Sequence, residues 1–335
     1  MSAAIGVRAA QLGRRTLVLT VDPAKRLATA LGLELNDDSD KQVSLTGVSG
    51  SLSAAVVDSK KIFDKFLITH ASGSDVVERI MKNRLYQQMS TTLSGSQEFT
   101  ALERLLQASE SDKYDLVILD TPPTKHAMDF LTAPQRLSNL FSDSITRWFS
   151  SSGDKPKGLI AAIVGKGTRT VLKSLEILTG AQFIDELVDF FGAVRSIQKV
   201  LHTRSLAAEA LLTNESTKFF VVTSFDAAKL TEAKYLQGQL KKLGYRLKAV
   251  IINRAFPLWL PDDEKALQAP TESEQSLQNF FDQFRAYYRM RYTLYEDFAK
   301  SLDSNIVLAR IPEYRQDVHG LEDLKSLAET LAEST

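Results

Sequence analysis

The chain has 335 residues, 44% hydrophobic and 24% charged, which is ordinary globular usage for about two domains or one large domain with an insertion. Its 41 basic residues balance 41 acidic ones, which argues against a general nucleic-acid or acidic-membrane binder. The absence of cysteine excludes disulfides, zinc–thiolate sites, iron–sulfur clusters and thiol nucleophiles. No apolar run reaches the roughly 18 residues that suggest a membrane span, and no secretory signal is recognised, so we expect a cytoplasmic protein.

Short apolar runs alternate with amphipathic helical stretches along the chain. Most of the runs lack polar alternation, which is typical of strands buried on both faces of a parallel sheet. The sequence therefore predicts an α/β fold with a mostly parallel, doubly wound sheet. The predicted strands are Thr16–Val21, Leu52–Val57, Leu116–Leu119, Phe219–Thr223, Leu247–Ile252 and Ile306–Leu308.

Two helices have recognisable ends. Asp226 can cap a helix that ends at Gly244, and Thr271 and Glu274 have the spacing of a capping box. The helix after Thr271 carries apolar residues with arginines between them, a pattern that could also stack nucleic-acid bases. We interpret these residues as a core face because their spacing is helical. They are Leu277, Phe281, Phe284, Tyr288, Tyr295 and Phe298, interleaved with Arg285, Arg289 and Arg291.

Residues 134–213 interrupt the alternation, because they show helical periodicity and no convincing strand. We predict an inserted helical subdomain there, which divides the α/β domain into residues 1–133 and 214–335. Phenylalanines within the insertion, among them Phe183, Phe190 and Phe191, are expected to pack its own core. The alternative is a groove for an apolar helix of a client protein.

Polar or proline residues follow four of the predicted strands. The carboxyl ends of parallel strands meet at one edge of a sheet, where ligands of open α/β sheets bind. Any one of these residues would be an ordinary turn residue, but the four groups together favour a site. They are Asp22 and Pro23, Asp120 with Thr121 and Pro122, Asn253 and Arg254, and Ile311 and Pro312.

The two strand-end carboxylates have the chemistry of a nucleotide hydrolase. An aspartate at the end of an apolar strand, as at Asp120, is a usual way for an NTPase to hold Mg²⁺, and a second one, Asp22, could orient the attacking water. Both roles need a phosphate cradle, yet the chain has no G-x-x-x-x-G-K-S/T motif. The nearest sequence, Gly165–Thr168, has the wrong spacing and lies in the predicted insertion, so we interpret it as a loop or helix start.

Several segments resemble one ATPase family, the arsenite-pump and tail-anchored-protein-targeting ATPases. Val21–Gly32 is similar to their switch I, and Tyr114–His126, continued by Asp129–Leu137, is similar to their switch II. Asn253 occupies the adenine-reading position, while Ile311-Pro312 and Gly320–Leu324 resemble the adenine loop and the last helix. The resemblance covers the whole chain, with the insertion in the expected place.

The resemblance implies a deviant P-loop ATPase that uses ATP and Mg²⁺ and works as a dimer with itself or with a homologous ATPase. Asp22 would position the attacking water, Asp120 would support Mg²⁺ and couple the γ-phosphate to switch II, and Asn253 would bind the purine. Pro23, Thr121, Pro122, Arg254, Ile311 and Pro312 would complete the nucleotide contacts. Hydrolysis would change the closure of the dimer and thereby the way it handles a protein client, in particular an apolar helix. Membranes would be involved only indirectly.

Two departures from the family pattern stand out. A strand and the phosphate loop are expected before a helix like Ser2–Leu12, and without them the sheet would lose a central strand and leave neighbouring edges unpaired. We therefore expect Met1 to be an internal residue; the alternative is a non-catalytic subunit that pairs with an intact homologue. The absence of cysteine also argues against arsenite capture and against the paired-cysteine zinc site of some family dimers.

Overall fold

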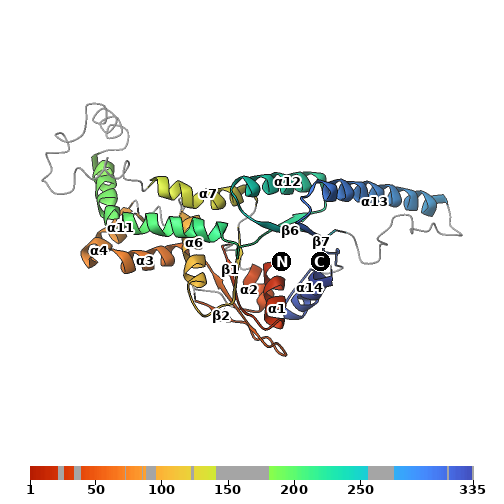
Figure 1. The fold of residues 1–335 in the computed structure, drawn as a ribbon, viewed down its shortest axis with the longest axis horizontal. Coiled ribbons are helices and arrows are strands. Elements are labelled where there is room, and N and C mark those ends of the chain that lie inside the picture. The colour runs from red at the N-terminus through yellow and green to blue at the C-terminus, as the bar shows by residue number, and fades with distance from the viewer. Residues whose placement is uncertain are drawn as a thin grey trace. The chain divides into compact units, whose positions relative to one another are not determined.

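The computed structural model describes two compact units of the chain (Figure 1). One contains residues 13–28 and 33–211, and the other residues 1–12, 29–32 and 212–335. The predicted domain boundaries at 134 and 213 stay a prediction, because much of that segment lies outside the described part. The described residues are 1–21, 26–33, 39–71, 73–84, 86–87, 96–121, 124–140, 181–255, 275–314 and 317–333.

The first unit is built on a four-stranded sheet with the order β2-β3-β1-β4. Its strands are β1 (Arg15–Thr20), β2 (Lys41–Gln42), β3 (Ser51–Val56) and β4 (Leu116–Asp120). The three predicted strands are confirmed and pair in parallel, and the predicted burial of β1 on both faces is confirmed as well. β2 is an additional antiparallel strand, which has no apolar signal because it consists of Lys-Gln.

The helices of this unit pack through an aromatic core. Phe66 and Phe99 meet edge to face with ring centroids 5.5 Å apart, and Ile197 and Leu201 join the same cluster. The helices are α3 (Ser59–His70), α4 (Ser74–Lys82), α6 (Ser96–Ser109), α7 (Thr124–Leu140) and α11 (Ala181–Thr213), together with α2 (Arg26–Leu31), whose residues are divided between the units. The described residues of the predicted insertion are therefore helical, as expected.

A buried ion pair joins α6 to α11 within this unit. Arg204 Nε lies 2.8 Å from Glu103 Oε2, and the Glu103 side chain is only 2% exposed. A second carboxylate, the half-exposed Glu110, lies 3.0 Å from Arg204 Nη1. Arg204 thus satisfies a carboxylate that water does not reach.

The second unit contains a parallel sheet with the order β5-β6-β7. The strands are β5 (Phe219–Ser224), β6 (Leu247–Asn253) and β7 (Val307–Arg310), all three of which the sequence predicts. Its helices are α1 (Ser2–Gln11), α12 (Ala227–Lys242), α13 (Gln275–Ser301) and α14 (Leu321–Glu333). Both ends of α12 are confirmed: the Asp226 carboxylate accepts the Lys229 N–H at 2.9 Å, and Gly244 has the left-handed φ of 74°.

The strands β4 and β5 each pair on one side only, within the described part of the chain. The predicted burial on both faces is wrong for β5, where Phe220 is 46% and Val222 is 47% exposed. The expectation that a strand and a phosphate loop are missing before Ser2 stays a prediction, because nothing in the described residues tests it.

The predicted inward aromatic face of α13 is wrong for the first half of the helix. Tyr288 and Phe298 are buried, but Leu277 is 55% exposed, and Phe281 and Phe284 are only partly covered. Helical spacing identifies an apolar face but does not say what covers it. The predicted cap at Thr271 and Glu274 lies outside the described residues. None of the helices in the described ranges is long and apolar enough to cross a membrane.

Candidate functional site

Three parallel strands of the first unit end side by side at the predicted ligand edge. Asp120, the last residue of β4, is the register partner of Thr20, the last residue of β1. The Val21 N–H donates to the Asp120 carbonyl at 3.3 Å, and the Val57 N–H donates to the Thr20 carbonyl at 2.9 Å. The chain therefore leaves β1 toward Asp22 directly beside the end of β4. Asp22, Pro23 and Pro122 themselves lie outside the described residues.

Asp120 and its neighbour lie at an accessible position. The Asp120 side chain is partly exposed and Thr121 is exposed. α7 begins at Thr124, so a helix N-terminus follows the strand-end carboxylate along the chain. The N–H groups and dipole of a helix N-terminus favour anions, phosphate among them. This edge therefore combines a carboxylate that can bind a cation with a backbone feature that favours phosphate.

A third carboxylate, which the sequence analysis missed, follows β3. Asp58 comes directly after Val57, and its side chain accepts the Lys61 N–H at 3.1 Å as the N-cap of α3. The signal was present in the sequence, since an aspartate after a strand and before a lysine-rich helical stretch is a usual capping pattern. Capping accounts for this residue, so we give it no ligand role.

The strand ends of the second unit bring the other predicted residues together. The Ile311 N–H donates to the Ile252 carbonyl at 2.8 Å, and the Ala255 N–H donates to the Ile311 carbonyl at 2.9 Å. Ile311 is thus hydrogen-bonded to the residue before and to the residue after the turn that Asn253 and Arg254 form. At Arg254 the backbone has a left-handed φ of 52°, which is uncommon for a residue other than glycine. Asn253 and Pro312 are partly exposed, whereas Ile311 is buried.

Arg254 forms an ion pair on this turn. Its Nη2 lies 2.6 Å from Asp317 Oδ1, and both side chains are about two-thirds exposed. An exposed pair of this kind contributes little stability. Its effect is to direct the guanidinium toward the segment that follows Pro312.

Arg291 of α13 is a structural residue of this edge whose role sequence reasoning missed. Its Nη2 donates to the carbonyls of Phe225 at 3.1 Å and Ala255 at 3.3 Å, which ties the end of β5 to the end of β6. The guanidinium also lies over the Phe225 ring, 4.7 Å from its centroid. The sequence shows an arginine among aromatic residues, but the two carbonyls come from distant loops and cannot be identified from that pattern.

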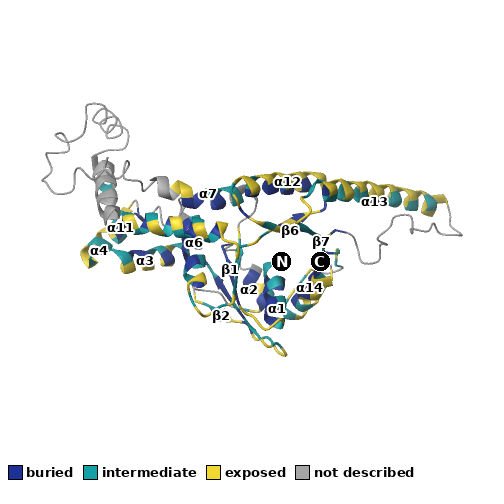
Figure 2. Cartoon of the chain, in the orientation of Figure 1, coloured by how far each residue is buried: buried dark blue, intermediate teal, exposed yellow. Residues whose placement is uncertain are grey.

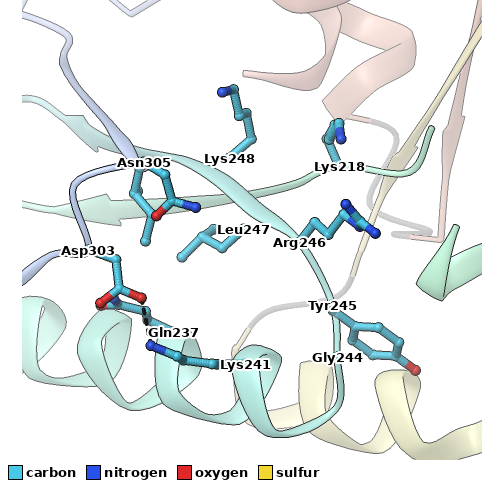
Figure 3. Close-up of a pocket in the computed structure, with 11 residues that line it drawn as sticks. Lys218, Gln237, Lys241, Gly244, Tyr245, Arg246, Leu247, Lys248, Asp303 and Asn305 are labelled. Atoms are coloured by element: carbon cyan, nitrogen blue, oxygen red, sulfur yellow. Dashed lines mark hydrogen bonds and ion pairs between the residues drawn. The ribbon is translucent and has the colours of Figure 1, made fainter. Parts of the chain in front are cut away.

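A cavity of about 390 Å³ lies at the opposite ends of the same strands (Figure 3). Its walls include Lys218, just before β5, and Leu247, the first residue of β6, whereas Asn253 is at the other end of β6. Figure 3 shows Lys241 and Asp303 paired at its rim, 2.9 Å apart. This cavity is therefore separate from the predicted site.

The described residues contain no group of three or more histidine or carboxylate side chains that could hold a metal by itself. A nucleotide-bound Mg²⁺ usually takes one or two protein carboxylates and completes its shell with phosphates and water. Asp120 has the oxygen donors for such an ion at an accessible strand end.

The matches to known proteins extend over nearly the whole chain and so include the strand ends of both units. The family model for the anion-transporting ATPases matches residues 1–333. The ATPase get3 of Aspergillus terreus is 23% identical over 98% of this chain and 85% of its own length. The ATPase GET3 of Kluyveromyces lactis is 24% identical over 98% of this chain and 84% of its own length. The ATPase get3 of Aspergillus niger is 22% identical, with 98% of this chain and 85% of the relative covered.

Proposed function

This chain belongs to the anion-transporting ATPase family, and from that membership we propose that it binds ATP with Mg²⁺ and hydrolyses it. We further propose that nucleotide binding closes a dimer and that this closure is coupled to the handling of a protein client. The observation that carries the proposal is the edge where β1 and β4 end together, with Asp120 beside the peptide that leads to Asp22.

The residues of the first unit would serve the phosphate end of the nucleotide. Mg²⁺, when bound, would neutralise charge on the phosphates during phosphoryl transfer. Asp120 would hold this ion directly or through water, with Thr121 and Pro122 beside it. Asp22 would accept a hydrogen bond from the attacking water and orient it toward the γ-phosphate, with Pro23 fixing the backbone next to it.

The residues of the second unit would serve the base. The Asn253 amide carries both a donor and an acceptor, which suits the edge of a purine. The two backbone hydrogen bonds of Ile311 fix the loop that follows β7, so Pro312 would present its ring at a defined position to the base. Arg254 would contact the nucleotide from the turn that it shares with Asn253.

A nucleotide titration with two matched variants tests this proposal. We expect the full chain to bind ATP more tightly with Mg²⁺ than without it, and Asp120→Asn to lose most of that difference because the amide cannot replace the charge. Asp58→Asn is the control, since it changes a carboxylate at the same sheet edge and asparagine also caps helices well. The proposal fails if Mg²⁺ has no effect on wild-type binding, or if the two variants behave alike.

Neither the handling of a protein client nor the alternative role as a non-catalytic subunit has support from the described residues. The side chains of Phe183, Phe190 and Phe191 lie outside the described part of the chain, so the predicted choice between a core and a client groove stays open. We do not propose a non-catalytic subunit, because no observation on the described residues favours it.

A further inference from the structure

The cavity drawn in Figure 3 has an excess of positive charge. It lies where the strands of the second unit begin, and its volume of about 390 Å³ is in the range of small-molecule sites. Asn253 and Ile311 lie at the other ends of these strands, so the proposed nucleotide contacts do not account for the charge. Four of the lining side chains are cations and one is a carboxylate: Lys218, Lys241, Arg246, Lys248 and Asp303.

Lys241 is accounted for without a ligand. Its Nζ lies 2.9 Å from Asp303 Oδ2, and Figure 3 shows the two side chains paired. Lys241 also lies in the last turn of α12, where a cation offsets the partial negative charge of the helix C-terminus. Asp303 and this helix end would both oppose an anion, so Lys241 alone makes no anion site.

Three cations next to the strands are less well neutralised. Within the described part of the chain, the Lys248 side chain has no ion pair or hydrogen bond, and Lys218 Nζ donates to a neutral group, the Glu215 carbonyl, at 2.6 Å. Arg246 Nη2 lies 3.0 Å from the Glu215 carboxylate, but that side chain is 85% exposed, so the pair contributes little. Together these charges outweigh the roughly half a negative charge of the α12 end.

A buried glutamine adds a polar group without a partner to the same cavity. Gln237 is 9% exposed, and its amide makes no hydrogen bond within the described residues. The amide is not among the fully enclosed side-chain atoms, so a ligand in the cavity can reach it. Figure 2 shows buried and exposed residues along α12, and the others on its buried side are apolar: Leu230, Ala233, Leu236 and Leu240. A glutamine at such a position costs stability unless it serves a ligand.

We propose that this cavity binds a small organic phosphate. The planar guanidinium of Arg246 and the ammonium of Lys248 both suit phosphate oxygens, and the Gln237 amide would donate to a further oxygen of the ligand. Leu247 and Ile306 are apolar parts of the wall, against which the carbon part of the ligand would lie. This site is separate from the nucleotide edge and does not depend on the proposed ATPase activity.

Titration of the full chain with phenyl phosphate, in the presence of EDTA, tests the proposal. We expect Lys248→Gln and Arg246→Gln each to weaken binding at least about tenfold, because each removes a charged hydrogen bond to the phosphate. Lys234→Gln is the matched control, since it removes the same charge from an exposed position of α12 outside the cavity. Inorganic phosphate should bind about tenfold more weakly than phenyl phosphate, because it has no apolar part to bury.

Two further variants give effects that a purely structural role would not. Asp303→Asn should tighten the binding of phenyl phosphate about threefold, because it removes a negative charge and releases Lys241. Gln237→Leu should weaken binding without lowering the free energy of unfolding, because leucine suits the apolar side of α12. A Gln237→Leu variant that is less stable but binds as tightly as wild type would overturn the role of the glutamine in this site.

The other outcomes of the titration also decide. No binding of phenyl phosphate at millimolar concentration would overturn the proposal, and so would equal effects of Lys248→Gln and Lys234→Gln. Tighter binding of hexaglutamate than of phenyl phosphate would indicate a surface for acidic proteins instead. Loss of binding in Asp120→Asn, with Lys248→Gln unchanged, would move the probe to the nucleotide edge. A chain that binds phenyl phosphate as proposed but not ATP keeps this site and loses the proposed function.

Discussion

Val21 and Asp120 are joined through their backbones, with the Val21 nitrogen 3.3 Å from the Asp120 carbonyl oxygen. This hydrogen bond extends the pairing of β1 and β4 by one step beyond Thr20. It places the peptide that leads to Asp22 beside the end of β4. The chain thus leaves β1 toward Asp22 beside Asp120, the carboxylate at the end of β4.

Asn253→Ala is predicted to weaken ATP binding by about tenfold, because one or two hydrogen bonds to the base are lost at about 0.5–1.5 kcal/mol each. The loss of affinity in Asn253→Ala should be smaller for GTP, whose base Asn253 does not match. The affinities of this variant for ATP and GTP should therefore be closer to each other than those of the wild type. Titration of both nucleotides measures this effect.

Ser224→Ala is the control for Asn253→Ala, since Ser224 is the register partner of Asn253 on β5 and its hydroxyl donates to Asp226 within the chain. Equal affinities of Asn253→Ala and wild type for ATP would remove Asn253 from the site.

Arg204→Ala is predicted to destabilise the first unit by about 3–5 kcal/mol, because it leaves the buried Glu103 carboxylate without its charged partner and with only the Gln107 amide as a hydrogen-bond donor. The double variant Arg204→Met, Glu103→Met should recover most of this loss, since no charge then remains buried. Denaturant unfolding measures both. Glu110→Gln, which removes only the half-exposed carboxylate, should change the free energy of unfolding by less than about 1 kcal/mol. A loss as large as that of Arg204→Ala would contradict this assignment.

The Asp115 carboxyl is expected to make the free energy of unfolding depend on pH in the acid range. Three hydrogen bonds from Arg15, two from its guanidinium and one from its backbone N–H, lower the pKa of the Asp115 carboxyl to about 2. A carboxyl with a lowered pKa in the folded state stabilises the protein above its unfolded pKa, and this contribution is lost as the pH falls from about 4 toward 2.

Asp115→Asn should therefore flatten the pH dependence of unfolding between about pH 4 and pH 2, while wild type loses stability there. Asp297→Asn, at an exposed position on α13, should leave the wild-type slope unchanged. An acid slope of Asp115→Asn as steep as that of wild type would show that the Arg15 contact does not stabilise the folded state.

The sequence predicted the strands well because most of them are continuous apolar runs with turn residues at their ends. Asp226 and Gly244 marked the ends of α12 through capping and a left-handed φ, which are local effects. β2 has no such signal, since two polar residues form it only by pairing with β3.

The site was predictable to the level of strand ends and not beyond. The pairing of Thr20 with Asp120 follows from parallel strands that end together, but the contacts of Arg291 depend on carbonyls from two other loops. The exposure of the first half of α13 was also not predictable from the sequence, because helical apolar spacing identifies a face but does not say whether anything covers it.

ATP hydrolysis by the wild type and by Asp22→Asn, each in a chain that carries the expected phosphate loop, tests the central claim most directly when nucleotide affinity is measured separately. We predict Mg²⁺-dependent turnover by the wild-type chain and a fall of about 10²–10⁴-fold in Asp22→Asn, because the attacking water loses the carboxylate that orients it. Affinity for ATP should be largely retained, since Asp22 acts on the water and not on the bound nucleotide. Wild-type turnover that Asp22→Asn leaves unchanged would contradict the assignment of Asp22, and absence of turnover in the wild-type chain would contradict the proposed ATPase activity.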